Sequence, residues 1–161
     1  LVPLGPKIIG VNRKGEAVDG CSKVITVDKI DSILPEADIL YLAMPETPGT
    51  KNLISHKRLD LLKPSCGIVN IGRQSTMDYD ALCEKLKTNK IAGAILDVFA
   101  SEPIEQNSKL WQIPNLIITP HVSADDGESY VRLTLDLFIK NLQLFISNKK
   151  LVNQIDKDFG Y

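Results

Sequence analysis

The feature that most constrains this sequence is a succession of six short apolar runs, separated by turn-rich or amphipathic stretches. Most of the runs are continuously apolar, which is typical of parallel strands covered on both faces. They lie at Lys7–Val11, Val24–Val27, Ile39–Met44, Gly67–Ile71, Ala92–Phe99 and Leu116–Thr119. We therefore expect a chain built on a mostly parallel β-sheet.

Helices are predicted between and after these strands, at Ser55–Leu62, Tyr79–Thr88 and about Glu128–Asn148. Asp78 stands at the N-cap position of the second helix. The third helix carries an apolar stripe at steps of three and four residues, namely Val131, Leu135, Phe138, Leu142 and Phe145. Strands that alternate with helices indicate βαβ units, so the predicted fold class is α/β with a doubly wound parallel sheet.

Composition excludes several classes of protein. The 161 residues include 19 Lys plus Arg and 20 Asp plus Glu, and this balance does not favour nucleic acid as a partner. No apolar run approaches the ~20 residues that cross a bilayer. Cys21, Cys66 and Cys83 are odd in number and form no CxxC pair, which argues against a disulfide framework or a metal site. We predict a reduced, soluble, cytoplasmic protein.

The first residues predict that the sequence enters partway through a longer protein. The chain begins at Leu1–Gly5 without Met or a secretory signal. Gly5, followed by Pro6, is typical of the glycine that ends a helix.

Ligands of a doubly wound sheet bind beyond the carboxyl ends of its strands. In this sequence those positions are Asn12-Arg13, Pro45–Thr50, Gly72-Arg73, Asp97–Glu102 and Pro120–Ala124. Taken singly, Arg73, Glu102 and His121 are unremarkable, since surface arginines, solvated loop glutamates and structural histidines are common. Together they place a cation, an acid and an imidazole at three strand ends of one sheet.

This trio predicts acid–base chemistry on a carbonyl group. A carboxylate beside an imidazole favours the imidazolium, which gives a proton to a carbonyl oxygen and takes it back in the reverse reaction. A guanidinium binds a carboxylate through two parallel hydrogen bonds. These groups suit the reduction of a 2-oxo acid by a hydride donor. The other histidine, His56, is expected on the surface at the start of a helix.

Several motifs in order resemble the nucleotide-binding domain of the D-isomer-specific 2-hydroxyacid dehydrogenases. They are Met44–Thr50, Gly67–Arg73, Asp97–Pro103, Leu110-Trp111 and Thr119–His121, and they cover nearly the whole chain. The tail Leu151–Tyr161 resembles the glyoxylate/hydroxypyruvate reductase-like branch. The resemblance implies a Rossmann-type fold and an NAD(P)-dependent reductase of small 2-oxo acids that commonly forms a homodimer.

The resemblance also implies roles for individual residues. Arg73 binds the substrate carboxylate, Glu102 orients and charges His121, and His121 is the acid/base. Asp97 corresponds to the acid that holds the nicotinamide ring. Besides Arg73 and His121, the positions that line the cofactor are Pro45, Thr50, Ile71, Gly72, Ser123 and Ala124.

The end of the first strand predicts NADP as the cofactor, with NAD as the alternative. An NAD site usually carries Asp or Glu there to accept hydrogen bonds from the ribose 2′-OH, whereas this chain has Asn12, Arg13 and Lys14. Arg13 offers charge-assisted hydrogen bonds to a 2′-phosphate, and Lys14 adds a point charge. A solvated basic turn is the competing interpretation of these residues.

The chain departs from the family pattern in two ways. Gln74 stands where the family usually has Gly, and its side chain could crowd the nicotinamide. In addition, the G-x-G-x-x-G turn that admits a pyrophosphate to a helix N-terminus does not occur in the sequence. We therefore assign residues 1–150 to the C-terminal part of an NAD(P)-binding domain, and 151–161 to a tail that returns toward an absent substrate domain.

The missing turn predicts a missing strand. In the strand order 3-2-1-4-5-6, the first strand lies between the second and the fourth. We equate Lys7–Val11 with the second strand and Ile39–Met44 with the fourth, so we expect their facing edges not to pair with each other.

Two other functions compete with an enzyme: a dinucleotide-sensing corepressor that binds protein partners, and an inactive fragment. The charge balance and the complete set of Arg73, Glu102 and His121 favour the enzyme. The expected partners are a small 2-oxo acid and a second copy of the chain, with neither nucleic acid nor membrane.

Overall fold

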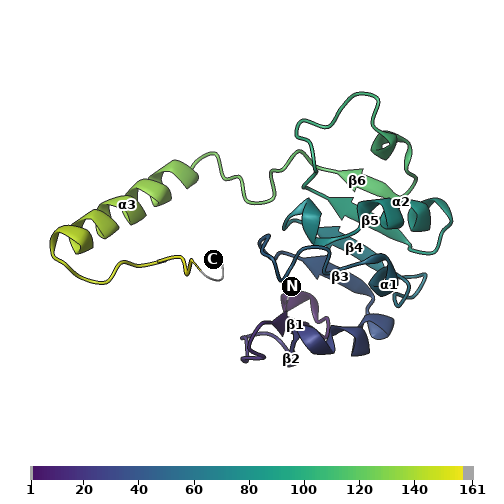
Figure 1. The fold of residues 1–161 in the computed structure, drawn as a ribbon, viewed down its shortest axis with the longest axis horizontal. Helices are drawn as coiled ribbons and strands as arrows, with labels where there is room; N and C mark the ends of the chain where they lie inside the picture. Colours follow the sequence, from purple (N-terminus) through teal and green to yellow (C-terminus); the bar gives the residue numbers. More distant parts are fainter. Residues whose placement is uncertain (1, 158–161) are drawn as a thin grey trace.

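The computed structural model describes residues 2–157, which form two separate parallel sheets (Figure 1). The strands are β1 (Ile9–Asn12), β2 (Lys23–Thr26), β3 (Ile39–Leu42), β4 (Gly67–Asn70), β5 (Gly93–Leu96) and β6 (Leu116–Ile118). The smaller sheet has the order β1-β2 and the larger one the order β3-β4-β5-β6, and every neighbouring pair is parallel. Each strand overlaps one of the predicted apolar runs, and β1 and β2 are each displaced beyond their run by one residue, so the parallel α/β architecture is confirmed.

The α-helices are α1 (His56–Leu59), α2 (Tyr79–Lys87) and α3 (Tyr130–Ile146). Short 3₁₀ helices lie between them: η1 (Val2–Leu4), η2 (Val27–Ser32), η3 (Leu34–Glu36), η4 (Gln74–Thr76) and η5 (Lys109–Gln112). The expected N-cap of α2 is confirmed, because Ala81 donates its N–H to Asp78 Oδ1 at 3.0 Å. The helix predicted at 55–62 is shorter than expected, since the N–H groups of Leu61 and Leu62 bond to carbonyls only three residues back.

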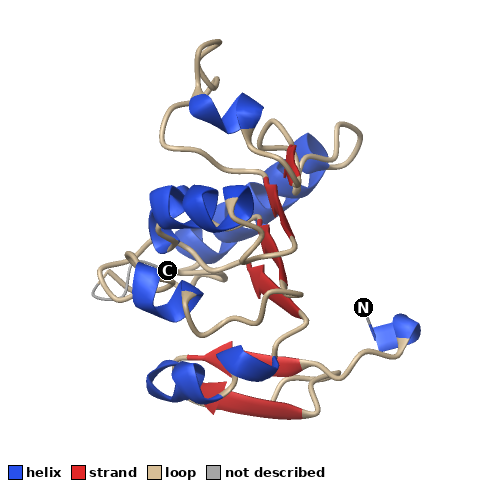
Figure 2. Cartoon of the chain, turned by 90° about the vertical axis from the view of Figure 1, so that its right-hand side faces the viewer, coloured by secondary structure: helices blue, strands red, loops and turns tan. Residues whose placement is uncertain are grey.

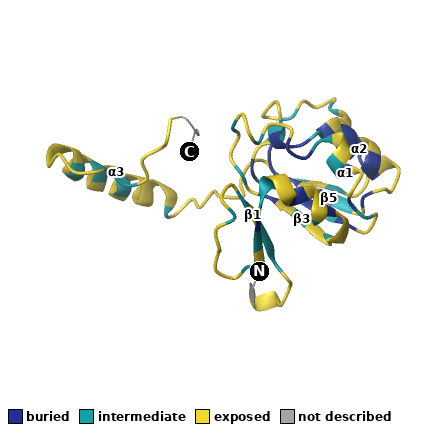
Figure 3. Ribbon diagram, turned by 60° about the horizontal axis from the view of Figure 1, so that its bottom comes forward, coloured by how far each residue is buried: buried dark blue, intermediate teal, exposed yellow. Residues whose placement is uncertain are grey.

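The core lies between the larger sheet and the helices α1 and α2, which cover one of its faces (Figure 2). The side chains that are no more than 1% exposed include Leu42, Ile68 and Leu96 from the strands and Leu59, Leu82 and Leu86 from the helices. In Figure 3 the buried residues gather in this layer. Full burial of one such side chain stabilises the fold by ~1.5–3 kcal/mol, so this layer holds the strand ends of the larger sheet in place.

The opposite face of the larger sheet carries an apolar row. Tyr41, Val69, Ile95 and Ile117 are register partners across the four strands. Tyr41 is 49% exposed and Ile117 58% exposed. Within the described residues, the cover expected on both faces of these strands is therefore present on one face.

A break separates the two sheets. Among residues 2–157, β1 pairs only with β2, and β3 pairs only with β4. The expectation that β1 and β3 do not pair with each other is confirmed. In a doubly wound sheet this break is the position of the first strand.

Helix α3 extends away from the sheets (Figure 1). It has the predicted bounds to within two residues at each end, but none of its residues is buried. The tail turns back onto it, because Asn141 exchanges two hydrogen bonds with the backbone of Val152, at 2.9 and 3.1 Å. The last four residues of the predicted tail, 158–161, lie outside the described residues.

Candidate active site

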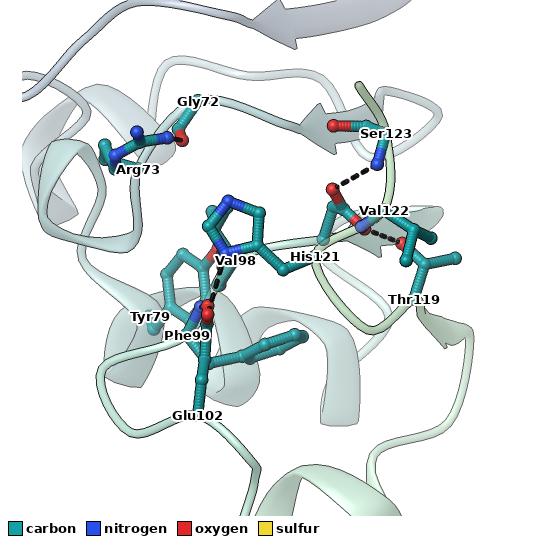
Figure 4. A network of polar contacts seen from close by, with 11 residues as sticks. Gly72, Arg73, Tyr79, Val98, Phe99, Glu102, Thr119, His121, Val122 and Ser123 are labelled. Atoms are coloured by element: carbon teal, nitrogen blue, oxygen red, sulfur yellow. Dashed lines mark hydrogen bonds and ion pairs between the residues drawn. The ribbon is translucent and has the colours of Figure 1, made fainter. Parts of the chain in front are cut away.

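Glu102 and His121 form the contact that the sequence predicts. Glu102 follows β5 and His121 follows β6, and His121 Nδ1 lies 2.7 Å from Glu102 Oε2 (Figure 4). The hydrogen bond with His121 lowers the pKa of Glu102, and a second bond from the Phe99 N–H lowers it further. Because an ionised carboxylate only accepts hydrogen bonds, Nδ1 carries a proton. Figure 4 shows the other ring nitrogen, Nε2, on the far side of the imidazole from Glu102.

The backbone of His121 is held in an unusual conformation. Its φ is +56°, in the left-handed region that residues other than Gly rarely adopt. Asp97 fixes this turn, accepting hydrogen bonds from Thr119 Oγ1 at 2.5 Å, from the Val122 N–H at 3.0 Å and from the Ser123 N–H at 2.9 Å. The carboxylate of Asp97 therefore clamps both sides of His121.

The clamp requires an ionised Asp97. Its burial by itself raises the pKa, but the hydrogen bonds from Thr119, Ser123 and Val122 outweigh burial and lower the pKa to about 2. The sequence predicted a role for Asp97 toward a cofactor and did not predict this clamp. The position of Asp97 at the end of a buried strand could have predicted it, since a buried acid needs nearby hydrogen-bond donors.

Gly72 and Arg73 form a tight turn after β4. A Cβ atom on Gly72 would lie 2.6 Å from the Met44 carbonyl oxygen, so only glycine fits against the chain beyond β3. Arg73 is exposed, and its Nη1 donates to the Gly72 carbonyl at 2.7 Å. Its guanidinium makes no hydrogen bond or ion pair with Glu102 or His121 in the described structure. Figure 4 shows it to one side of the imidazole.

The backbone of Gln74 does not adopt the positive φ that would require glycine. Gln74 begins η4, and the described non-glycine residues with positive φ do not include it. The backbone argument for Gly at this position therefore does not apply to this chain.

Asn70 and Tyr79 are polar residues of the site that sequence reasoning missed. Asn70 is fully buried at the end of β4, and its Oδ1 accepts from the Gly72 N–H at 3.0 Å. Its Nδ2 donates to the Arg73 carbonyl and to the Tyr79 hydroxyl, each at 3.2 Å. An Asn inside the apolar run that forms β4 was a usable signal, because buried amides are kept where they are hydrogen-bonded. No comparable pattern in the sequence marks Tyr79.

The remaining positions predicted to line a cofactor lie at strand ends. The Ile71 N–H continues the ladder to Leu42 O at 3.0 Å. The Thr50 hydroxyl closes its own turn, donating to the Pro45 carbonyl at 2.7 Å and accepting from the Thr47 N–H at 2.8 Å. Beyond His121, Ser123 and Ala124 lie in an exposed loop.

The basic turn after β1 is internally braced. Asn12 Oδ1 accepts from the Gly15 N–H at 2.6 Å, and Asn12 Nδ2 donates to the Glu16 carbonyl at 2.9 Å. Lys14 forms an ion pair of 3.3 Å with Glu16, which offsets the point charge that the sequence assigned to Lys14. Arg13 is exposed at this turn.

Neither a membrane span nor a metal cluster is found in residues 2–157. No helix there is long and apolar enough to cross a membrane. No group of three or more His, Cys, Asp or Glu side chains there is arranged to hold a metal ion.

Comparison with known proteins matches residues 1–123 to the family model described as the D-isomer specific 2-hydroxyacid dehydrogenase, NAD binding domain. The chain is 37% identical over 136 residues to the D-3-phosphoglycerate dehydrogenase of Synechocystis, covering 83% of the chain and 24% of that protein. It is 40% identical over 100 residues to the glyoxylate/hydroxypyruvate reductase B of Pectobacterium carotovorum, covering 62% of the chain and 31% of that protein.

A solved structure of a glyoxylate/hydroxypyruvate reductase has the same fold as this chain. The NADPH-dependent glyoxylate/hydroxypyruvate reductase of Sinorhizobium meliloti, in complex with NADP and sulfate, superposes with a TM-score of 0.89 at 29% identity. The match covers 99% of this chain and 51% of that one. The chain thus spans about half or less of the length of these relatives.

Proposed function

Because this chain belongs to the D-isomer specific 2-hydroxyacid dehydrogenase family, we propose that it supplies the cofactor-binding and acid–base half of an oxidoreductase. The complete protein would transfer a hydride between a nicotinamide cofactor and a small 2-oxo or 2-hydroxy acid of the glyoxylate or hydroxypyruvate kind. The observation that carries the proposal is the 2.7 Å contact between His121 and Glu102, beside the Arg73 turn.

The residues present fit the nicotinamide end of a dinucleotide. Gly72, Asp97 and Ser123 bring backbone and carboxylate groups to one edge of the larger sheet, where an imidazole and a guanidinium also lie. When bound, the cofactor supplies or accepts the hydride. We assign the lining of its site to Asn12, Arg13, Pro45, Thr50, Ile71, Gly72, Arg73, Asp97, His121, Ser123 and Ala124.

His121 moves the proton in the proposed reaction. In reduction, the imidazolium donates its Nε2 proton to the carbonyl oxygen of the 2-oxo acid, and in oxidation the neutral imidazole takes it from the hydroxyl. The lowered pKa of Glu102 keeps its carboxylate ionised, so that it holds Nδ1–H and stabilises the charged ring. Arg73 binds the substrate carboxylate through its guanidinium fork.

NADP is the proposed cofactor, with NAD as the alternative. The carboxyl end of β1 has Asn12 and Arg13 in place of an acid, so a 2′-phosphate meets a cation and no carboxylate at those two positions. The relative from Sinorhizobium meliloti, which has the same fold, is NADPH-dependent and was solved with NADP.

We further propose the organisation of the complete protein. Residues 1–150 form the C-terminal part of its NAD(P)-binding domain, and 151–161 run toward a substrate domain. The family match over 1–123 and the partial coverage of longer relatives support this division. A cytoplasmic homodimer is the proposed state.

The test is cofactor consumption by the complete protein with glyoxylate and hydroxypyruvate, using NADPH and NADH in parallel. We expect turnover with at least one of the two acids, and a rise in KM for the acid in Arg73→Lys, which keeps the charge but loses the fork. Dinucleotide binding without turnover of any 2-oxo acid would contradict the proposal and favour a sensing protein.

A further inference from the structure

One peptide group beside the site is held from both sides. The Phe99 N–H donates to Glu102 Oε1 at 2.8 Å. The carbonyl of the same peptide group, that of Val98, accepts a hydrogen bond from the Tyr79 hydroxyl at 2.9 Å. The plane of this peptide therefore fixes where the Glu102 carboxylate can lie, and Tyr79 fixes the plane.

Tyr79 is built to donate this hydrogen bond. It is the first residue of α2 and only 8% exposed, and its ring contacts the Phe99 ring edge to face at 6.5 Å between centroids. Burial raises the pKa of Tyr79 well above its usual value, so the hydroxyl keeps its proton. With that proton committed to Val98, the oxygen accepts from Asn70 Nδ2 at 3.2 Å.

Asn70 extends the same network to the other half of the site. Its amide also bonds to the Gly72 N–H and the Arg73 carbonyl, which form the turn that carries the guanidinium. The two strand ends that supply Arg73 and Glu102 are thus connected through one buried amide and one buried hydroxyl. His121 is the last group in the series, through Glu102 Oε2.

We propose that Tyr79 is a positioning residue for the Glu102–His121 pair, acting through the Val98–Phe99 peptide, and that Asn70 ties this arm to the Arg73 turn. The proposal rests on the proposed function for its catalytic consequence. Its structural part stands on contacts that hold with or without turnover.

The physical basis is the coupling of hydrogen bonds in series. A carbonyl that accepts a hydrogen bond polarises its own peptide, which strengthens the bond that the N–H of that peptide donates. Tyr79→Phe keeps the ring against Phe99 and removes the hydroxyl, so the Val98 carbonyl loses this donor. The bond from Phe99 to Glu102 weakens, and Glu102 becomes free to leave His121.

The pKa of Glu102 is a direct measure of this coupling. The titratable groups that face Glu102 within the described residues are His121, Asp97 and Tyr79. Of these, Asp97 opposes ionisation of Glu102, while the hydrogen bonds from His121 and Phe99 lower the pKa. Weakening the bond from Phe99 therefore moves the pKa of Glu102 upward, toward its ordinary value.

The experiment compares Tyr79→Phe with Tyr41→Phe in the complete protein. Tyr41 is half-exposed on β3, and its hydroxyl makes no hydrogen bond with any described residue. Tyr41→Phe is therefore the matched control that also removes one hydroxyl. Carboxyl-labelled glutamate is followed by NMR across the acid range, and Glu102→Gln identifies the signal. In parallel, kcat and KM for the 2-oxo acid are measured.

We expect the Glu102 midpoint to rise in Tyr79→Phe and to stay in place in Tyr41→Phe. We also expect kcat to fall about three- to tenfold in Tyr79→Phe with less than about a twofold change in KM, as loss of one hydrogen bond implies. Equal Glu102 titrations in the two variants would overturn the proposal, even if Tyr79→Phe were less stable. If the wild type turned over no 2-oxo acid, the proposed function would fail, and the titration would still decide the role of Tyr79.

Discussion

Helices α2 and α3 are both amphipathic, and they differ in what lies against their apolar faces. In α2, Leu82 and Leu86 are fully buried against the larger sheet. In α3, Phe138 is 62% exposed and Phe145 71% exposed. A 3.6-residue apolar period thus predicts a helix with an apolar face, while the burial of that face depends on a neighbouring element that the period does not identify.

The candidate active site lies beside the covered sheet, apart from α3. In the described structure, the side chains of Glu102, His121 and Asp97 make all their hydrogen bonds with residues 97–123, beside the sheet that α2 covers. The family match also ends at residue 123, before α3 begins. The covered sheet therefore holds the proposed chemistry, and α3 with its tail contributes no group to it.

The largest effect on stability should come from replacing one apolar leucine by alanine in each of the two helices. Leu86→Ala in α2 leaves a cavity in the core and should lower the free energy of unfolding by ~2–5 kcal/mol. Leu142→Ala in α3, where Leu142 is 44% exposed, should change it by less than about 1 kcal/mol. Urea unfolding of the 161-residue chain measures both. Equal losses would mean that α3 is covered in solution, and the contrast between the helices would fail.

A smaller effect should come from the clamp on His121. The pKa of Asp97 is about 2, below its ordinary value of 3.8, so its ionised form stabilises the fold above about pH 4. This contribution is lost as the pH falls from roughly 4 to 2. Asp97→Asn should lower stability at neutral pH by ~1.5–3 kcal/mol, because hydrogen bonds to a charged group are replaced by weaker ones.

Thermal unfolding at a series of pH values checks this prediction. The wild type should lose more stability between roughly pH 4 and pH 2 than Asp97→Asn does. Parallel curves for the two proteins would show that Asp97 is not the group that titrates.

The smallest effect should come from the outlying β1–β2 sheet, where Arg13 lies. Arg13→Ala in the complete protein should reduce the preference for NADPH over NADH about tenfold, which corresponds to ~1.4 kcal/mol. The loss should appear in kcat/KM for NADPH, with kcat/KM for NADH nearly unchanged. An unchanged ratio of the two values would show that this turn does not select the cofactor.

Much of the fold could be predicted because the signals are local. The six apolar runs and the Asp78 cap are properties of a few neighbouring residues, and the structure bears them out. The cover of the sheet and of α3 could not be predicted, because it depends on contacts between distant segments. The break between β1 and β3 was predictable only after the strand order was inferred from the family resemblance.

The site shows the same division. The contact of Glu102 with His121 followed from two strand ends and the resemblance, and it is confirmed. The clamp by Asp97 and the link through Asn70 and Tyr79 were missed, because each joins residues from different strand ends through side-chain hydrogen bonds. The positions of Asp97 and Asn70 in apolar runs indicated that they need hydrogen-bond partners, but no periodicity or spacing identifies those partners.

In the proposed reaction His121 transfers the proton, and a comparison of the two histidines of the chain tests this role. His121→Ala is compared with His56→Ala, since His56 lies on the surface at the start of α1 with its side chain 66% exposed. In the complete protein, with saturating NADPH and glyoxylate or hydroxypyruvate, kcat should fall roughly 10²- to 10⁴-fold in His121→Ala. It should change less than about twofold in His56→Ala. Similar kcat values for the wild type and His121→Ala would contradict this role.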